Sequence, residues 1–171
     1  MLISRDTPKK TVLELGKAEC KAAKCSFCCT YGSGILEASD IPRIAKFLRL
    51  TEEELKERHL DEVERFHTKG FRPKIKAKDR PYGPCVFHNA KVGCTIHPVR
   101  PLQCRIGNCN QHSADLQKWF DLNYFVNADD PQSIRDYSLW LEFNEPLPGG
   151  RLNELVPNES RRKQVLSYEV V

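Results

Sequence analysis

The alternation of apolar and polar residues is most regular between residues 40 and 50, where it predicts a helix. Asp40 can cap the start of this helix, and Pro42 is tolerated because it falls in the first turn. The apolar positions then recur at helical spacing on one face: Ile41, Ile44, Ala45 and Leu48. A stripe of this kind is most simply a core-facing surface, with no chemistry implied.

A second helix is predicted to begin directly afterwards. Thr51 and Glu54 have the spacing of a capping box, and the acidic run Glu52–Glu54 suits the positive end of a helix dipole. Gly70 offers a stop. The apolar positions follow at imperfect helical spacing: Leu55, Leu60, Val63 and Phe66.

The flanking segments are less regular. Val12, Leu13 and Leu15 fit either a short strand or one helical turn. Residues 20–34 fit no regular period and are interpreted as a loop wrapped around something. Residues 71–112 hold five prolines, which exclude long regular elements, although a single helical turn after Pro101 can carry Cys104 and Arg105.

Near the C-terminus, Asp130 and Pro131 form a good N-cap and first-position pair for another helix. The chain becomes polar after residue 144. We therefore expect a cysteine-cluster metal-binding domain over residues 1–145 and a polar C-terminal tail or peripheral element over residues 146–171. The expected fold is mainly α with irregular loops, a small single domain organised around a cysteine-ligated metal site.

Composition and charge narrow the function classes. The chain has 171 residues, of which 40% are hydrophobic, so it can bury a core without cross-links. Its formal net charge is +4, and acidic and basic residues are interleaved. The basic stretch from Lys69 to Arg80 can meet a phosphate or an acidic partner, but a solvated loop or edge strand is the favoured interpretation.

The sequence contains no apolar run long enough to span a membrane and no secretory signal. We therefore expect no membrane partner and a cytoplasmic location, where thiols stay reduced. A reducing compartment disfavours a disulfide framework, so this expectation decides how the cysteines are interpreted.

The eight cysteines fall into two groups separated by a long cysteine-free span. The first group is Cys20, Cys25, Cys28 and Cys29, and the second is Cys85, Cys94, Cys104 and Cys109. Metal ligation explains this clustering better than disulfide bonds or unrelated buried thiols do. All eight are candidate ligands, and Cys25, Cys28, Cys29, Cys94 and Cys104 are the strongest.

The spacing within the first group has chemical meaning. Cys25 and Cys28 are separated by two residues, so both sulfurs can reach one metal. Cys29 follows at once, and a disulfide between adjacent cysteines has unfavourable geometry. Adjacent sulfurs are instead suited to a polynuclear centre, in which they bind different metal atoms.

The second group brings two arginines to the same region. Arg100 and Arg105 flank Cys104 and are candidate cofactor-binding residues, since they can offset the negative charge of a thiolate centre. The histidines in this region, His88, His97 and His112, are assigned packing or solvent roles rather than ligation. The aromatic cluster Trp119, Phe120, Tyr124 and Phe125 is assigned to core packing or to a wall that shields the centre.

Two segments of the sequence resemble the CxxCxxCC family of zinc- or iron-chelating proteins, also called YkgJ-type cysteine-cluster proteins. The segments are Cys25–Cys29, and Gly93 to Arg105 with the order Gly-Cys-Thr-Ile-His-Pro-Val-Arg-Pro-Leu-Gln-Cys-Arg. The chain departs from the family pattern in the four residues between Cys20 and Cys25, and in His97, where the family often has tyrosine. The resemblance covers about residues 20–112.

The resemblance implies metal or iron–sulfur binding without an assigned reaction. A related cysteine segment occurs in flagellin lysine methylases, but this chain has no glycine-rich nucleotide loop, so the cluster is carried over and the activity is not. An iron–sulfur cluster is favoured over zinc, because simple zinc knuckles place residues between paired ligands.

Three function classes follow from this interpretation. The first is a metal-centre protein for electron transfer, metal handling or redox sensing, which can have a protein partner. The second is a cluster-containing protein-modifying enzyme of the methylase-like kind. The third, a structural-zinc module that binds nucleic acid, ranks last because no recognition-helix pattern supports it.

Overall fold

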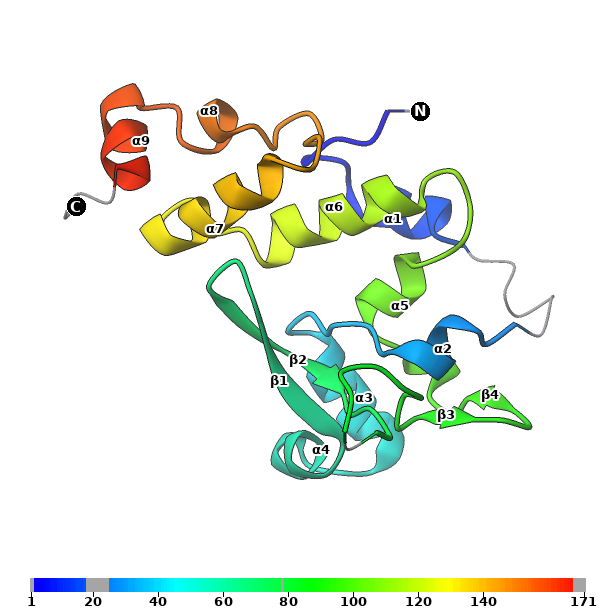
Figure 1. The fold of residues 1–171 in the computed structure, drawn as a ribbon. Helices are drawn as coiled ribbons and strands as arrows, with labels where there is room; N and C mark the ends of the chain where they lie inside the picture. The colour runs from blue at the N-terminus through cyan, green and yellow to red at the C-terminus, as the bar shows by residue number, and fades with distance from the viewer. Residues whose placement is uncertain (1, 18–24, 78, 168–171) are drawn as a thin grey trace. The chain divides into compact units, whose positions relative to one another are not determined.

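The computed structural model describes residues 2–17, 25–77 and 79–167 (Figure 1). Within these residues the chain is mostly helical with irregular loops, as predicted. The described α-helices are α1 (Lys9–Leu15), α2 (Cys28–Tyr31), α3 (Asp40–Leu48), α4 (Glu52–His59), α5 (Leu102–Ile106), α6 (Ser113–Tyr124), α7 (Pro131–Leu141), α8 (Leu152–Leu155) and α9 (Glu159–Leu166).

Four short strands and one 3₁₀ helix complete the described elements. Strands β1 (Leu60–Arg65) and β2 (Thr68–Pro73) form one two-stranded sheet, and β3 (His88–Asn89) pairs with β4 (Gly93–Cys94) in another; η1 covers His97–Val99. Of the described helices, none is long and apolar enough to cross a membrane.

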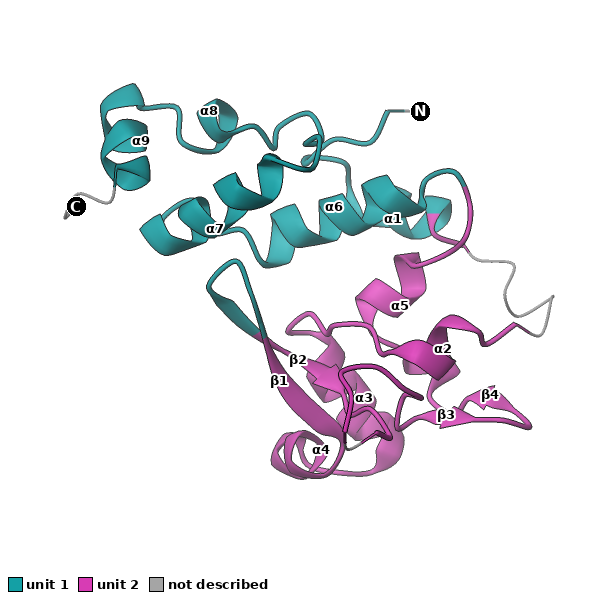
Figure 2. Cartoon of the chain, viewed as in Figure 1, with its two compact units in different colours: residues 1–15, 64–69, 111–171 teal, residues 16–63, 70–110 magenta. Residues whose placement is uncertain are grey.

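The chain divides into two compact units whose segments alternate along the sequence (Figure 2). Unit 1 contains residues 1–15, 64–69 and 111–171, and unit 2 contains residues 16–63 and 70–110. The seven described cysteines all belong to unit 2. Residues 146–171 share unit 1 with residues 1–15 and 111–145, so the expected boundary at residue 145 is not a boundary between these units and stays a prediction.

Unit 2 has an apolar core to which two of the cysteines belong. Cys85 is buried within this core, and Cys94 packs against it as a partly buried residue. The other buried members are Leu36, Ile44, Ala45, Leu55, Leu60, Phe87 and Ile96. Fully burying one Leu or Ile side chain contributes about 1.5–3 kcal/mol, so this cluster fixes the backbone around both thiols by ordinary hydrophobic burial.

The starts of α3 and α4 show one correct and one wrong prediction. The capping box of α4 is confirmed, because Thr51 Oγ1 accepts the Glu54 N–H at 3.1 Å while the Glu54 carboxylate accepts the Thr51 N–H at 3.0 Å. The assignment of Asp40 as the cap of α3 is wrong. Ser39 holds the N-cap position, and the side chain of Asp40 is buried against other partners.

The second predicted helix is also too long. Helix α4 ends at His59, and the chain continues as β1 from Leu60, so the apolar residues Leu60 and Val63 lie on a strand. The spacing of these residues was imperfect for a helix, and a turn at Phe66 and His67 lets the strand pair with β2 instead. Gly70 lies within β2 and does not stop a helix.

The turn between β1 and β2 is held in an unfavourable backbone conformation. Phe66 and His67 have φ angles of 47° and 57°, the left-handed region that both positions of a type I′ hairpin require. Each such non-glycine residue costs about 1–3 kcal/mol, so the surroundings must hold it in place. The Phe66 ring meets the rings of Tyr137 and Trp140 edge-on, with centroids 5.4 and 6.1 Å away.

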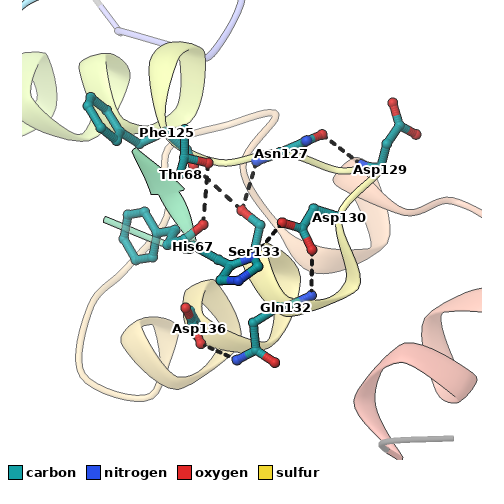
Figure 3. A network of polar contacts seen from close by, with 10 residues as sticks. His67, Thr68, Phe125, Asn127, Asp129, Asp130, Gln132, Ser133 and Asp136 are labelled. Carbon is teal, nitrogen blue, oxygen red and sulfur yellow. Dashed lines mark hydrogen bonds and ion pairs between the residues drawn. The ribbon is translucent and has the colours of Figure 1, made fainter. Parts of the chain in front are cut away.

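The other turn residue is tied to the start of α7 (Figure 3). His67 Nδ1 lies 2.7 Å from Asp130 Oδ2, and Asp130 Oδ1 accepts the Gln132 N–H at 2.9 Å. The predicted N-cap role of Asp130 is therefore confirmed. The same carboxylate serves the helix and the hairpin turn, both of which belong to unit 1.

The rest of unit 1 settles several open sequence assignments. Val12 is buried on α1, so the segment of undecided type is helical. The aromatic cluster packs on α6 and just after it, with the Phe120 ring 5.1 Å from Tyr124 and 5.8 Å from Phe125. The polar C-terminal segment forms α8 and α9, and Val165 of α9 is buried.

The His67–Asp130 pair makes stability depend on pH. The hydrogen bond and the charge of Asp130 raise the pKa of His67, and the same bond lowers the pKa of Asp130. The His67 contribution is therefore complete below the ordinary histidine pKa and is lost as pH rises through the raised one. The Asp130 contribution is present above the ordinary carboxyl pKa and is lost at more acidic pH.

We therefore expect His67→Ala to lower the free energy of unfolding more at about pH 5.5 than at about pH 8.5. Urea unfolding at both pH values measures this difference, and an NMR titration of the His67 ring measures its pKa directly. Asp130→Asn should return that pKa to the ordinary range. An equal loss of stability at both pH values would contradict the pairing.

Candidate metal centre

The structure brings five of the seven described cysteines together in unit 2. They are Cys28 and Cys29 on α2, Cys85 before β3, Cys94 on β4 and Cys104 on α5. Burial, together with the charges of Cys85, Cys94 and Cys28, raises the pKa of Cys104 to about 12. The charges of these sulfurs act on one another's pKa values, so the two cysteine groups of the sequence lie near each other in unit 2.

Backbone pairing joins the two groups directly. The Cys85 N–H donates to the Cys29 carbonyl at 2.9 Å, and the Gly83 N–H donates to the Tyr31 carbonyl at 3.1 Å. Cys85 also forms an antiparallel bridge with Ile75 on its other side. The predicted loop over residues 20–34 thus contains one helical turn, α2, whose backbone is bonded to the segment that carries Cys85.

The β3–β4 hairpin places Cys94 relative to the first cysteine group. Cys94 lies opposite His88 in the hairpin register. The His88 ring nitrogen Nε2 lies 3.1 Å from the hydroxyl of Ser26, which stands between Cys25 and Cys28 in the sequence. His88, to which the sequence assigns packing, thereby links the hairpin to the first cysteine segment through a polar contact.

Several peptide N–H groups point at the sulfurs. The sulfur of Cys85 accepts from the amide of Phe87, that of Cys94 from Ile96, and that of Cys104 from Gly34; each of these bonds lowers the pKa of its thiol. Hydrogen bonds to a thiolate stabilise its charge and are a recognised means of tuning thiolate-bound metals. The backbone is therefore arranged to receive ionised sulfur.

The adjacent pair on α2 shares a proton. A hydrogen bond from the Cys29 thiol lowers the pKa of Cys28 to about 6, and the same bond raises the pKa of Cys29. The protein around this partly exposed pair displaces some of its water, which opposes ionisation of both thiols. Five sulfurs at one place cannot all ionise without a nearby cation, because each thiolate raises the pKa of the next.

A buried carboxylate positions the segment that carries Cys104. Asp40 has no exposed surface, and its Oδ2 accepts the N–H of Leu102, the first residue of α5, at 2.7 Å. It also accepts the Glu37 N–H at 3.0 Å. Asp40 therefore caps α5 from the start of α3, which explains why it does not cap its own helix.

Arg43 completes this polar network. Its guanidinium is paired with Asp40 and also donates to the carbonyl of Arg100 at 3.1 Å. The buried charge is thus compensated, as a buried ion pair must be. One carboxylate and one guanidinium hold both ends of the segment from Arg100 to Leu102, just before Cys104.

The segment before α3 lies directly against Cys104. Ile35 N–H donates to Gln103 Oε1 at 2.6 Å. A Cβ added at Gly34 would overlap Cys104 Sγ and lie 3.0 Å from the Cys104 nitrogen, so any larger residue would displace the sulfur. Glycine is required here because the backbone approaches Cys104 closely. The run Gly32-Ser33-Gly34 is the only feature of the sequence that pointed to this requirement.

The two candidate arginines occupy different surroundings. The charge of Arg100 lowers the pKa of Cys28 and Cys94, and its guanidinium donates to the ring of His97. Burial lowers the pKa of Arg105, with Arg43 acting in the same direction, while Asp40 and Glu37 act against it. Arg100 therefore acts on the sulfurs, and Arg105 belongs to the Asp40 network.

Three candidate ligands lie outside the group of five. Cys25 and Cys109 are exposed, as Cys28 also is, and neither Cys25 nor Cys109 is among the groups that shift the pKa values of the five described thiols. Cys20 falls outside the described residues. The ligand roles of these three stay predictions from the sequence.

The donor set fits a thiophilic metal, although its side chains are not closed around a point. Among the residues that the structure describes, no three His, Cys, Asp or Glu side chains are arranged so that they could hold a metal ion. The convergence of soft sulfur donors and the N–H groups aimed at them nevertheless match thiolate ligation of zinc or iron. Metal binding would replace the Cys28–Cys29 hydrogen bond with metal–sulfur bonds.

The Asp40 network yields a stability prediction. Asp40→Ala leaves the Leu102 and Glu37 amides and the Arg43 guanidinium without their acceptor, and breaking a buried pair in this way costs about 3–5 kcal/mol. Asp40→Asn can keep the amide bonds through its oxygen while it loses the Arg43 pair, so we expect a smaller loss. Urea unfolding measures both.

Asp61 provides the matched control, because it is an exposed carboxylate on β1 of the same unit. Asp61→Ala should change the free energy of unfolding by no more than about 0.5 kcal/mol. If Asp40→Ala were as mild as Asp61→Ala, the carboxylate would not position α5.

Comparison with known sequences agrees with this site. Residues 19–124 match the sequence family described as "CxxCxxCC: Putative zinc- or iron-chelating domain", and this range contains all eight cysteines. No curated protein and no solved structure matches the chain. The match covers more than half of the chain and includes both cysteine groups. The chain therefore belongs to the CxxCxxCC family of zinc- or iron-chelating domains.

Proposed function

We propose that unit 2 binds one thiolate-ligated metal centre with ligands from both cysteine groups, and that this centre is an iron–sulfur cluster used for electron transfer or redox sensing. The observation that carries the proposal is the convergence of five sulfurs, Cys28, Cys29, Cys85, Cys94 and Cys104, onto one place with peptide N–H groups directed at them. Family membership supports metal chelation in general.

The number and adjacency of the sulfurs favour a cluster over a single zinc ion. A structural zinc site is closed by four ligands, whereas five thiols meet here. Cys28 and Cys29 are neighbours in the chain, and neighbouring sulfurs reach different metal atoms more readily than the same one. When bound, a cluster would supply one-electron chemistry at this place.

The chain's own residues have separate tasks in this proposal. The cysteines hold the centre, and the amides of Gly34, Phe87 and Ile96 stabilise negative charge on the sulfurs. Arg100 adds a positive charge on the side of Cys28 and Cys94. The apolar core behind Cys85 keeps water from that side of the site.

Anaerobic purification followed by metal and acid-labile sulfide analysis tests the proposal. We expect iron with sulfide and a broad absorption band at about 400 nm from thiolate-to-iron charge transfer. Cys85→Ser and Cys104→Ser should lose most of the metal, whereas Cys109→Ser, which changes an exposed thiol outside the group of five, should retain it.

The possible results separate the two parts of the proposal. Zinc without sulfide would overturn the cluster and leave a shared thiolate site. Loss of metal in Cys109→Ser but not in Cys104→Ser would overturn the ligand set. Far-ultraviolet circular dichroism on each variant distinguishes loss of a ligand from loss of the fold, since metal binding and folding are coupled at such sites.

Arg100 and Arg105 give a test of the electrostatics. Removing a positive charge near a cluster favours its oxidised, less negative state, so we expect Arg100→Gln to lower the midpoint potential by an amount on the order of tens of millivolts. Arg105→Gln should lower it less, because its charge is shared with Asp40 and Glu37. Protein-film voltammetry of the two variants measures the difference, and equal shifts would contradict the separate roles.

A further inference from the structure

The surface beside the five sulfurs carries exposed aromatic rings. Phe27 and Tyr31 flank Cys28 and Cys29 on and beside α2, and they remain 68% and 56% exposed. Their ring centroids are 4.9 Å apart. Single exposed apolar side chains are normal on a protein surface, whereas a contiguous apolar patch with a polar rim marks an interaction site.

A third exposed ring is brought to this pair by the backbone. Tyr82 is 51% exposed, and the Gly83 N–H that follows it donates to the Tyr31 carbonyl at 3.1 Å. The guanidinium of Arg80 lies over the Tyr82 ring, 5.1 Å from its centroid. We call Phe27, Tyr31, Tyr82 and Arg80 the aromatic patch.

The charged residues around the aromatic patch are mainly basic. Lys76 is exposed, its N–H donates to the carbonyl of Pro84 at 2.7 Å, and its Nζ donates to the His88 carbonyl in the hairpin that carries Cys94. Residues 25–34 contain no acidic residue, and Asp79 is the single acidic residue between positions 74 and 94. A partner that covers this surface must therefore bring negative charge.

We propose that the aromatic patch docks an acidic protein that exchanges electrons with the thiolate centre. Tyrosine, phenylalanine and arginine are enriched at protein interfaces, and tyrosine and arginine dominate their energetic centres. The docked partner would lie next to Cys28 and Cys29, because the patch residues Phe27 and Tyr31 belong to the same turn of chain. The exchange of electrons with the docked partner rests on the proposed function. The existence of the surface does not depend on it.

The ring contacts favour a protein over a nucleic acid. Single-stranded nucleic acids bind by stacking bases on open ring faces. Here Arg80 covers a face of Tyr82, and Phe27 and Tyr31 lie against each other with an interplanar angle of 51°. The exposed rings therefore present edges and side faces, which suit the irregular surface of a protein better than a stack of bases.

Fluorescence anisotropy with a labelled peptide tests the patch. The probe is a short peptide in which glutamates alternate with leucine and phenylalanine, and the metal-loaded full chain is titrated into it. We expect saturable binding that weakens with salt. The double variant Phe27→Ser with Tyr31→Ser should weaken it about tenfold or more, and Arg80→Glu should weaken it and flatten its salt dependence.

Matched controls come from unit 1. Phe143 is 87% exposed and Lys10 is exposed, so Phe143→Ser and Lys10→Glu remove a ring and a charge of the same kinds elsewhere on the chain. Both should bind the peptide as the unaltered chain does. Metal analysis of each sample keeps the tests separate, since peptide binding by a chain that holds no iron would support the patch and overturn only the cluster.

Three results would overturn the docking proposal. The first is the absence of peptide binding, or equal binding by the patch variants and the controls. The second is tighter binding of a labelled single-stranded RNA of similar length, which would assign the patch to nucleic acid. The third is self-association in analytical ultracentrifugation that the patch variants abolish, which would assign it to a second copy of the chain.

Discussion

Burial of several neighbouring thiols, which opposes their ionisation and is reinforced by repulsion between ionised sulfurs, is the constraint on which the cysteine-bearing unit depends. Burial and the neighbouring sulfurs raise the pKa of Cys104 to about 12, and a proton shared with Cys28 raises the pKa of Cys29. Without a nearby cation, these thiols would stay protonated at neutral pH. The exception is Cys28, because the hydrogen bond from Cys29 lowers its pKa to about 6. Amide donors and the charge of Arg100 lower the pKa values of individual thiols, but each of these effects is local and modest. Only a cation can offset several thiolates at once, which is why the arrangement makes physical sense as a metal site.

The two cysteine groups are far apart in the sequence, so their meeting requires contacts that do not involve sulfur. These contacts are polar and specific: Asp40 accepts the Leu102 N–H, Gln103 accepts the Ile35 N–H, and the Cys85 N–H donates to the Cys29 carbonyl. A buried carboxylate such as Asp40 is an expensive way to stabilise a fold and an effective way to fix a register. Its bond to Leu102, the first residue of the Cys104 helix, fixes the register of this segment relative to α3.

The sequence revealed what is encoded locally and missed what is encoded by distant partners. Thr51 and Glu54 cap α4 from within three residues, and Asp130 caps α7 in the same way, so both helix starts were predictable. Asp40 looked like a cap because its residue type and position fit, yet its partner lies 62 residues away on α5. No periodicity or capping rule reports such a contact.

The misassigned helix after His59 has the same origin. The short run with Leu60 and Val63 fits both the helical and the strand period only weakly. The deciding factor is a hairpin turn at two residues, Phe66 and His67, of types that seldom adopt positive φ. Phe66 tolerates this because Tyr137 and Trp140 pack against it, and both lie more than 70 residues further along the chain. Tertiary contacts outweighed local preference at this turn.

The candidate site, too, could be predicted from the sequence only in part. Clustering and adjacency identified the cysteines, because thiolate ligation imposes short spacings that can be read directly from the chain. They did not identify Gly34, whose lack of a side chain admits the Cys104 sulfur, nor the exposure of Cys25 and Cys109. Spacing reports which residues can share a metal, whereas the fold decides which of them do.

The hydrophobic core bears on how far metal and folding are coupled in this chain. In the smallest zinc domains the unfolded chain becomes ordered only when metal binds, because no core exists without it. Here Cys85 is itself a member of a core with Ile44, Leu55, Phe87 and Ile96, and burial of these side chains is independent of any metal. The elements α3, α4 and the Cys85 segment therefore have their own source of stability. The turn that carries Cys28 and Cys29 buries none of its side chains, so it has the least stability of its own and the most to gain from metal–sulfur bonds.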